Sequence, residues 1–291
     1  MWQTEIERQH VGVEGQRFSA ADLHELAALS VEEEDEALRA VYAFLAEWFS
    51  PAATVEVQTS GSTGVPKRMR VEKERMMRSA VRTCEFLGLR PGDTALLCMD
   101  LKYIGAKMMV VRALVAGLHL WVRRPSGHPL ADGEGRVDFL SVVPMQLYHT
   151  LEQAVDEALE RRLEYLPCRV YSTYGMTETL SHVALRPLNG PEASVGYRPF
   201  EGVSLSLSAR GTLVIHAPEL CSSDLETNDV ARLHADVHDR GACGQCGKQR
   251  GRENSDRGGR AAAERAYRRA FCLDFRTGQV VGRGFGVVGY P

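Results

Sequence analysis

A run of small and polar residues, Thr59-Ser60-Gly61-Ser62-Thr63-Gly64-Val65-Pro66-Lys67, has the composition of a polyphosphate-binding loop. Gly61 and Gly64 permit tight backbone angles and leave amide N–H groups exposed. The hydroxyls are further hydrogen-bonding groups, and Lys67 adds a positive charge. The run is not a Walker loop, because that pattern places glycine directly before the lysine and a Ser or Thr after it. Taken alone, the run fits a polar surface turn as well as a phosphate site.

A second segment, Tyr174-Gly175-Met176-Thr177-Glu178-Thr179, follows a β-branched and aromatic stretch at 169–174. Open α/β sheets bind ligands at the carboxyl ends of their strands, so this position favours a site. Glu178 offers the oxygen ligands that Mg²⁺ prefers, and Tyr174 could stack on a base. The alternative is an ordinary strand-to-helix turn, capped by Thr177 or Thr179.

A third segment, Thr227-Asn228-Asp229, is the weakest of the three. The Asp229 carboxylate could accept hydrogen bonds from both hydroxyls of a ribose. An Asn-Asp pair is more often only a turn.

These segments must be positioned by alternating strands and helices. Apolar periodicity predicts helices at 36–49, 72–87, 105–117 and 145–166, and strands at 54–57, 94–99, 118–122, 137–143 and 169–174. The alternation indicates an α/β fold with layered, mostly parallel sheets. The stretch 203–218 alternates with period two around Ala209-Arg210-Gly211, which predicts a hairpin in a small antiparallel β subdomain. We read the first 52 residues as a helical segment.

Composition excludes several classes. The 291 residues are 44% hydrophobic and 25% charged, typical of a globular protein. No apolar run is long enough to span a bilayer and no leader follows Met1, so we expect a cytoplasmic protein without membrane contact. Most of the seven cysteines lie far apart, which argues against a secreted disulfide scaffold. The sequence does not specify an oligomeric state.

The order of the three segments resembles the adenylate-forming superfamily of acyl-CoA synthetases, adenylation domains and luciferases. Three stretches resemble its o-succinylbenzoate–CoA ligases: CEFLGLRPGDTALLCMDLKYIGAKMMVVRALVAG, STYGMTETLSHVALR and LNGPEAS. The resemblance covers roughly residues 53–236, which we take as the AMP-binding domain. It implies a fold like the N-terminal domain of these enzymes.

The resemblance also implies a reaction. The carboxylate of 2-succinylbenzoate attacks the α-phosphorus of ATP, and coenzyme A then displaces AMP from the acyl-adenylate, a step of menaquinone biosynthesis. Residues 59–64 and Lys67 would hold the β- and γ-phosphates, and Thr177 would contact the α-phosphate. Glu178 would bind Mg²⁺. Tyr174, with Gly175 and Met176, would line the adenine site, and Asp229 would hold the ribose. Another acyl or aryl acid stays open as the substrate.

Four further residues are candidates for the acyl pocket: Tyr103, Lys107, Ser181 and His182. Lys107 could pair with a carboxylate of the dianionic succinylbenzoate, or it could be a lysine whose stem lies along a buried helix. Ser181 and His182 follow the second segment and could face the pocket. His182 fits a structural histidine equally well.

The sequence departs from the family twice. A strand and a glycine-rich turn are missing near 151–154, a probable deletion that would open the sheet beside the site. After Asp236 nothing resembles the family, including its C-terminal domain and that domain's adenylation lysine. Residues 237–291 instead carry eleven Lys or Arg against five Asp or Glu, and eleven glycines. We expect this tail to be largely disordered and the chain to turn over weakly or not at all, with residual nucleotide binding.

The tail is readable in another frame. With suitable codons, the family segment F-T-I-V-G-R-A-D-N-V-V-N-S-G-G-V-K-I-Q, translated two bases out of register, gives residues 238–255 without a mismatch. We infer a frameshift near Val237. A zinc or nucleic-acid site around Cys243 and Cys246 is the competing hypothesis. No cysteine partner has zinc-site spacing and no aromatic residue interleaves with the arginines before Tyr267, so we expect no nucleic-acid partner.

Overall fold

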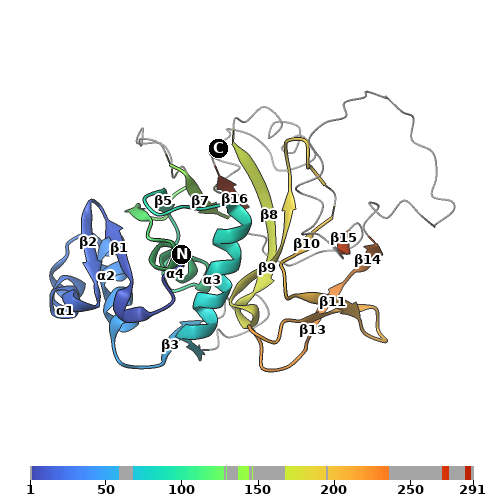
Figure 1. The fold of residues 1–291 in the computed structure, drawn as a ribbon, viewed down its shortest axis with the longest axis horizontal. Coiled ribbons are helices and arrows are strands. Elements are labelled where there is room, and N and C mark those ends of the chain that lie inside the picture. Colours follow the sequence, from blue (N-terminus) through green and yellow to red (C-terminus); the bar gives the residue numbers. More distant parts are fainter. Residues whose placement is uncertain are drawn as a thin grey trace.

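The computed structural model describes residues 2–58, 68–127, 129, 137–143, 146, 168–194, 196–235, 271–274 and 286–289. Figure 1 shows helices α3 and α4 between an N-terminal unit and the long strands β8 and β9. The described helices are α1 (Leu23–Glu32), α2 (Glu36–Phe49), α3 (Lys73–Leu87) and α4 (Ile104–Ala116), with 3₁₀ turns η1 (Ile6–Arg8), η2 (Ala20–Asp22) and η3 (Thr177–Thr179).

The main sheet has the strand order β10-β9-β8-β16-β7-β5-β6-β1-β2. Its strands are β1 (His10–Val13), β2 (Gln16–Ser19), β5 (Thr94–Leu97), β6 (His119–Val122), β7 (Phe139–Val142), β8 (Arg169–Met176), β9 (Ser181–Pro187), β10 (Arg198–Pro199) and β16 (Gly286–Gly289).

The expected α/β fold is confirmed, but the sheet is mixed rather than mostly parallel. The pairs β1–β6, β6–β5 and β5–β7 are parallel. β16 is antiparallel to both β7 and β8, so β8 runs in the same direction as β7. The carboxyl ends of β5, β7 and β8 therefore meet at one edge of the sheet. The hairpin pairing of β8 with β9 supplies much of the antiparallel part.

The sequence predicts a helical segment over the first 52 residues, but the structure also has two strands there, β1 and β2. A tight turn at Glu14-Gly15 joins β1 to β2, and β1 pairs with β6, so this segment belongs to the main sheet. Glu14 and Gly15 both have positive φ, which the glycine adopts without strain. Ser19 and Asp22 form a capping box at the start of η2.

Helices α3 and α4 pack against each other beside the sheet (Figure 1). Both follow the predicted periodicity within a residue or two, and both end at a glycine with left-handed backbone angles, Gly88 and Gly117. Almost every residue of α4 is buried, as expected for a helix that is apolar all round. Lys107 and Arg112 are the exceptions to that apolar character.

The predicted small antiparallel sheet is present. It consists of β11 (Ser204–Leu207), β12 (Thr212–His216) and β13 (Leu225–Val230), and the turn between the first two lies at Ala209-Arg210-Gly211 as expected. Two further sheets have two antiparallel strands each. One pairs β3 (Thr54–Gln58) with β4 (Arg68–Glu72), and the other pairs β14 (Arg232–Ala235) with β15 (Phe271–Asp274).

Several predictions fall outside the described residues. These are the nucleotide-binding run at 59–67, most of the helix at 145–166, the deletion at 151–154, and the Cys243–Cys246 pair. Two segments of the tail, β15 and β16, are strands, contrary to the expectation of disorder there. In the described part of the chain, no helix has the length and apolar character needed to cross a membrane.

Candidate functional site

The second and third motifs meet in space. The Tyr174 hydroxyl, near the carboxyl end of β8, donates a hydrogen bond of 2.6 Å to Asp229 Oδ2 on β13. The Tyr174 ring is buried, and its edge packs against Tyr197 with ring centroids 6.1 Å apart. Burial raises the pKa of Tyr174, and the bond to Asp229 raises it further, so the phenol stays a donor. Two segments 55 residues apart thus form one site.

Gly175 is required by the close approach of the next strand. The β8–β9 register shifts at Tyr174/Gly175, and a Cβ built on Gly175 would lie 1.9 Å from the Ser181 carbonyl oxygen. No side chain fits there, because the obstacle is backbone that cannot rotate away. The glycine therefore lets β9 fold tightly under the turn that follows β8.

The turn after Met176 is held by Thr179. Its buried hydroxyl accepts from the Met176 amide at 2.9 Å and lies within hydrogen-bond distance of the Met176 and Ser181 carbonyls. Leu180 and Ser181 both have positive φ, at 57° and 101°. Such angles in residues with side chains cost energy and are concentrated at functional sites. The turn, not a helix start, is what the T-E-T residues form.

Glu178 is exposed on this turn, whereas Thr177 is buried. Among the described residues the Glu178 carboxylate has no ion-pair partner, while its carbonyl accepts from Cys221 Sγ. No group of three His, Cys, Asp or Glu side chains in the described part could hold a metal. One exposed carboxylate without a protein cage fits Mg²⁺, which keeps waters and uses substrate phosphates as ligands.

The run 59–67 connects β3 to β4. Gln58, the last residue of β3, pairs with Arg68, the first residue of β4, so the residues on either side of the run are neighbours. Gln58 also forms a parallel bridge with Tyr103, which precedes α4 just beyond the carboxyl end of β5. Tyr103 therefore lies beside Gln58, the residue that precedes the predicted phosphate run. It is at the edge of the sheet where the carboxyl ends of β5 and β8 lie.

Lys107 is turned towards protein groups. Its Nζ donates to the Glu56 carbonyl oxygen at 2.6 Å and lies 3.8 Å from Glu47 Oε2, above the Phe44 ring. Burial lowers the pKa of Lys107, an effect that the carboxylates of Glu47 and Glu56 oppose. Of the two roles that the sequence left open, this geometry favours the structural one.

His182 is also engaged by protein. Arg112 Nη2 lies 3.0 Å from His182 Nε2 and 3.2 Å from Ser181 Oγ. Arginine is always a donor, so Nε2 must accept, and the proton must sit on Nδ1, 3.3 Å from Ser181 Oγ. Thr83 Oγ1 on α3 also lies 3.0 Å from Nε2. Burial, and then the Arg112 charge, hold the pKa of His182 well below its usual 6.5.

Arg112 is the residue that sequence reasoning missed. It is 1% exposed, its Nε has no hydrogen-bond partner among the described residues, and no described carboxylate forms an ion pair with it. Burial lowers its pKa to about 10. The signal was available, because a single arginine interrupts the apolar run MMVVRALVA. It ties α4 to the side chains of Ser181 and His182, which follow the turn at Thr177–Thr179.

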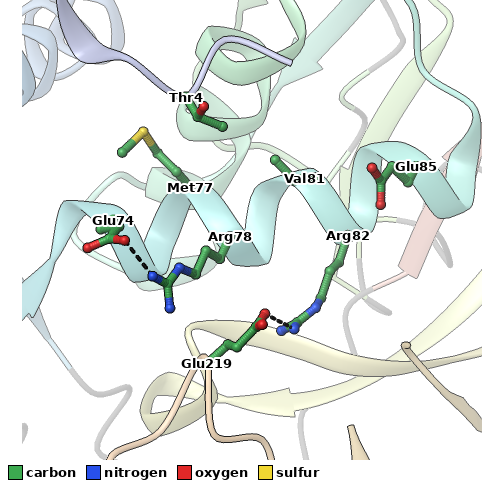
Figure 2. Close-up of a pocket in the computed structure, with 8 residues that line it drawn as sticks. All are labelled: Thr4, Glu74, Met77, Arg78, Val81, Arg82, Glu85 and Glu219. Carbon is green, nitrogen blue, oxygen red and sulfur yellow. Dashed lines mark hydrogen bonds and ion pairs between the residues drawn. The ribbon is translucent and has the colours of Figure 1, made fainter. Parts of the chain in front are cut away.

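A cavity of about 500 Å³ lies beside α3, away from these residues. Figure 2 shows its lining, in which Arg82 pairs with Glu219 and Arg78 with Glu74. It contains none of the predicted site residues. Since its arginines already have acidic partners, we assign no ligand to it.

The comparisons with known proteins identify the family of the chain. The sequence profile described as AMP-binding enzyme matches residues 23–208, more than half of the chain. The chain belongs to this family. For an AMP-binding enzyme, the meeting of Tyr174 and Asp229 at the carboxyl edge of the sheet is a suitable place for a nucleotide.

Relatives of this AMP-binding enzyme are ligases. A 2-succinylbenzoate–CoA ligase of Bacillus cereus is 27% identical over 224 residues, which are 65% of this chain and 46% of that relative. The chain thus spans about half the length of the curated relatives it matches. An acyl-CoA synthetase (AMP-forming)/AMP-acid ligase II-like protein of Dyadobacter fermentans is 34% identical, with a TM-score of 0.63, over 69% of this chain and 63% of that one.

A third comparison concerns the fold alone. The o-succinylbenzoate coenzyme A synthetase of Bacillus subtilis, solved with ATP and a magnesium ion, is 18% identical with a TM-score of 0.55. The match covers 76% of this chain and 70% of that chain. The likeness confirms the expected fold of an adenylate-forming N-terminal domain.

Proposed function

We propose that this chain binds ATP at the carboxyl edge of β8 and is the adenylating part of an o-succinylbenzoate–CoA ligase. The observation that carries the proposal is the hydrogen bond between Tyr174 and Asp229. It brings a buried aromatic ring and a partly exposed carboxylate together, which suits a base and the hydroxyls of its ribose.

The remaining roles follow from position. Thr177 and Glu178 lie on the turn directly after Tyr174, where the phosphates of a nucleotide bound at Tyr174 would extend. Residues 59–64 and Lys67 would hold the β- and γ-phosphates, and Glu178 would bind the Mg²⁺. When bound, the ion would neutralise charge on the phosphates.

The reaction would proceed in two steps on these groups. A substrate carboxylate would attack the α-phosphorus, with pyrophosphate leaving, and the thiol of coenzyme A would then displace AMP. The chain's contribution is positioning and charge stabilisation, because phosphoryl transfer needs little covalent chemistry from the protein.

One observation favours a different acid as substrate. Lys107, the candidate partner for the second carboxylate of succinylbenzoate, is already bonded to the Glu56 carbonyl. A monocarboxylic aryl or acyl acid needs no such cation.

Nucleotide binding by Asp229 variants tests the proposal. Asp229→Ala should raise the dissociation constant for AMP at least tenfold, about 1.4 kcal/mol, because the ribose loses its acceptor. Asp224→Ala is the matched control, since this exposed aspartate pairs only with His216 among the described residues. The control should change affinity less than twofold. Equal AMP affinity of Asp229→Ala and the unaltered chain in calorimetry would overturn the assignment.

A further inference from the structure

Strand β16 (Gly286–Gly289) lies inside the main sheet although it comes from the end of the chain. It pairs antiparallel with β7 on one side and with β8 on the other (Figure 1). Val288 is in register with Leu140 and with Val170, and Val287 with Ser141 and Tyr171. The segment is thus a central strand and not an edge strand.

Without β16 the sheet would be split. β7 and β8 run in the same direction with one strand between them, so they stand about 9.5 Å apart, twice the usual strand spacing. They cannot bond to each other at that distance. β7 lies inside the sheet, so without β16 its N–H and C=O groups on that side would lose their protein partners.

The residue types of β16 suit the position. Leu140 and Val170 belong to one buried apolar cluster, with Leu96, Cys98, Val137, Val142 and Cys168. The register sets residue 288 between them. Valine is a residue type favoured in β-strands, and the neighbouring Val287 shares that preference.

The same strand reaches the functional site through β8. β16 pairs with the segment from Arg169 to Ser172, and Tyr174 follows two residues later on that strand. A strand held on both sides is more rigid than one held only by β9. The tail therefore supports the strand that carries the Tyr174 hydroxyl.

We propose that the position between β7 and β8 is a strand-accepting site, and that the chain's own C-terminal strand fills it and so holds β8 in place. The contacts are backbone hydrogen bonds, as in proteins that take up an added strand. The inference stands independently of the proposed function.

Engineered disulfides test the register in the full chain. The pair Leu140→Cys with Val288→Cys should close on mild oxidation, because opposed residues of an antiparallel pair have Cα atoms within disulfide range. The control pair, Ser141→Cys with Val288→Cys, is one residue out of register and places its cysteines on opposite faces. Both are made with Cys98 and Cys168 replaced by alanine, and peptide mass mapping identifies the bond.

We expect the first pair to form an intramolecular disulfide at least tenfold more often than the control. Equal yields would overturn the register. An intermolecular bond in the first pair would overturn the assignment of the chain's own strand as occupant, because a second copy would then supply it.

Hydrogen exchange gives a test that needs no cysteine. Val288→Pro removes a backbone donor and cannot continue the ladder, so amides of β7 and β8 should exchange at least tenfold faster. Val288→Thr keeps the β-branched shape and the backbone N–H and should exchange like the unaltered chain. Unchanged protection of β7 and β8 in the proline variant would refute the proposal.

Discussion

The buried histidine behind the functional turn predicts a specific loss of stability in acid. His182 Nε2 accepts from Arg112 at 3.0 Å, and the ring is 3% exposed. A second positive charge cannot be accommodated beside the guanidinium, so the folded chain keeps His182 neutral. The unfolded chain lets the same histidine take up a proton. Replacing His182 with glutamine, whose side-chain carbonyl can still accept from Arg112, removes this difference between the two states.

The magnitude follows from linkage. The pKa of His182 is lowered well below its unfolded value of 6.5. Its contribution to stability is therefore fully present above that pH and is lost as the pH falls. Between pH 6.5 and the folded pKa, each unit by which the pH falls lowers the free energy of unfolding by roughly 1 kcal/mol. The loss continues until the pH reaches the folded pKa.

Urea unfolding at pH 7.5 and 5.5 measures this. The unaltered chain should lose roughly 1 kcal/mol more of its free energy of unfolding between the two pH values than His182→Gln does. His24→Gln, which removes an exposed histidine on α1, is the control and should behave like the unaltered chain. The reasoning fails if His182→Gln shows the same acid loss as the unaltered chain. It also fails if NMR shows the His182 ring titrating near 6.5.

Three further predictions concern the positions that shape the fold. Gly175→Ala should cost about 3 kcal/mol, the upper end for overpacking, since its Cβ would meet the Ser181 carbonyl at 1.9 Å. Gly190 has open space around it but a positive φ, so Gly190→Ala should cost about 1–2 kcal/mol of stability. If the two alanine variants lower the melting temperature equally, the steric argument for Gly175 is wrong. Asp35→Ala should cost about 1 kcal/mol in urea unfolding, because Asp35 Oδ1 accepts from the Ala37 and Leu38 amides. Asp35→Ser should retain most of the stability that Asp35→Ala loses, because serine can also cap the helix. If Asp35→Ser is as unstable as Asp35→Ala, the capping role is wrong. Burial raises the pKa of the Cys84 and Cys98 thiols to about 12, so iodoacetamide at pH 8 should label neither until urea unfolds the chain; rapid labelling of the folded chain would contradict their burial.

Much of the fold could be predicted because local patterns agree with it. The apolar periodicity at 36–49 coincides with α2, and the alternation around Ala209-Arg210-Gly211 gave the hairpin β11–β12. The N-terminal strands were missed because β1 (HVGV) and β2 (QRFS) are short and contain polar residues or glycine in place of a continuous apolar run. They are stabilised by pairing with β6 and with each other, which a local pattern does not reveal. Strand β9, which pairs antiparallel with β8, was missed for the same reason.

The site was predicted in part. The family resemblance placed Tyr174 and Asp229 in one predicted nucleotide site, and the structure brings the two side chains into hydrogen-bond contact. The surroundings of Lys107 and His182 could not be predicted, since their partners come from α2, β3 and α4. Which groups a polar side chain meets inside a protein depends on tertiary packing, and spacing along the chain does not specify it.

Titration with a non-reactive acyl-adenylate tests the central claim most directly. The ligand is adenosine joined through a sulfamate to 2-succinylbenzoate. It therefore occupies the nucleotide site and the acid site with one molecule. We predict that it binds at least tenfold more tightly than AMP, and that Asp229→Ala loses at least tenfold in affinity for both. The benzoate analogue, which lacks the succinyl carboxylate, should bind more weakly. Failure of the unaltered chain to bind either AMP or the sulfamate in calorimetry would contradict the account.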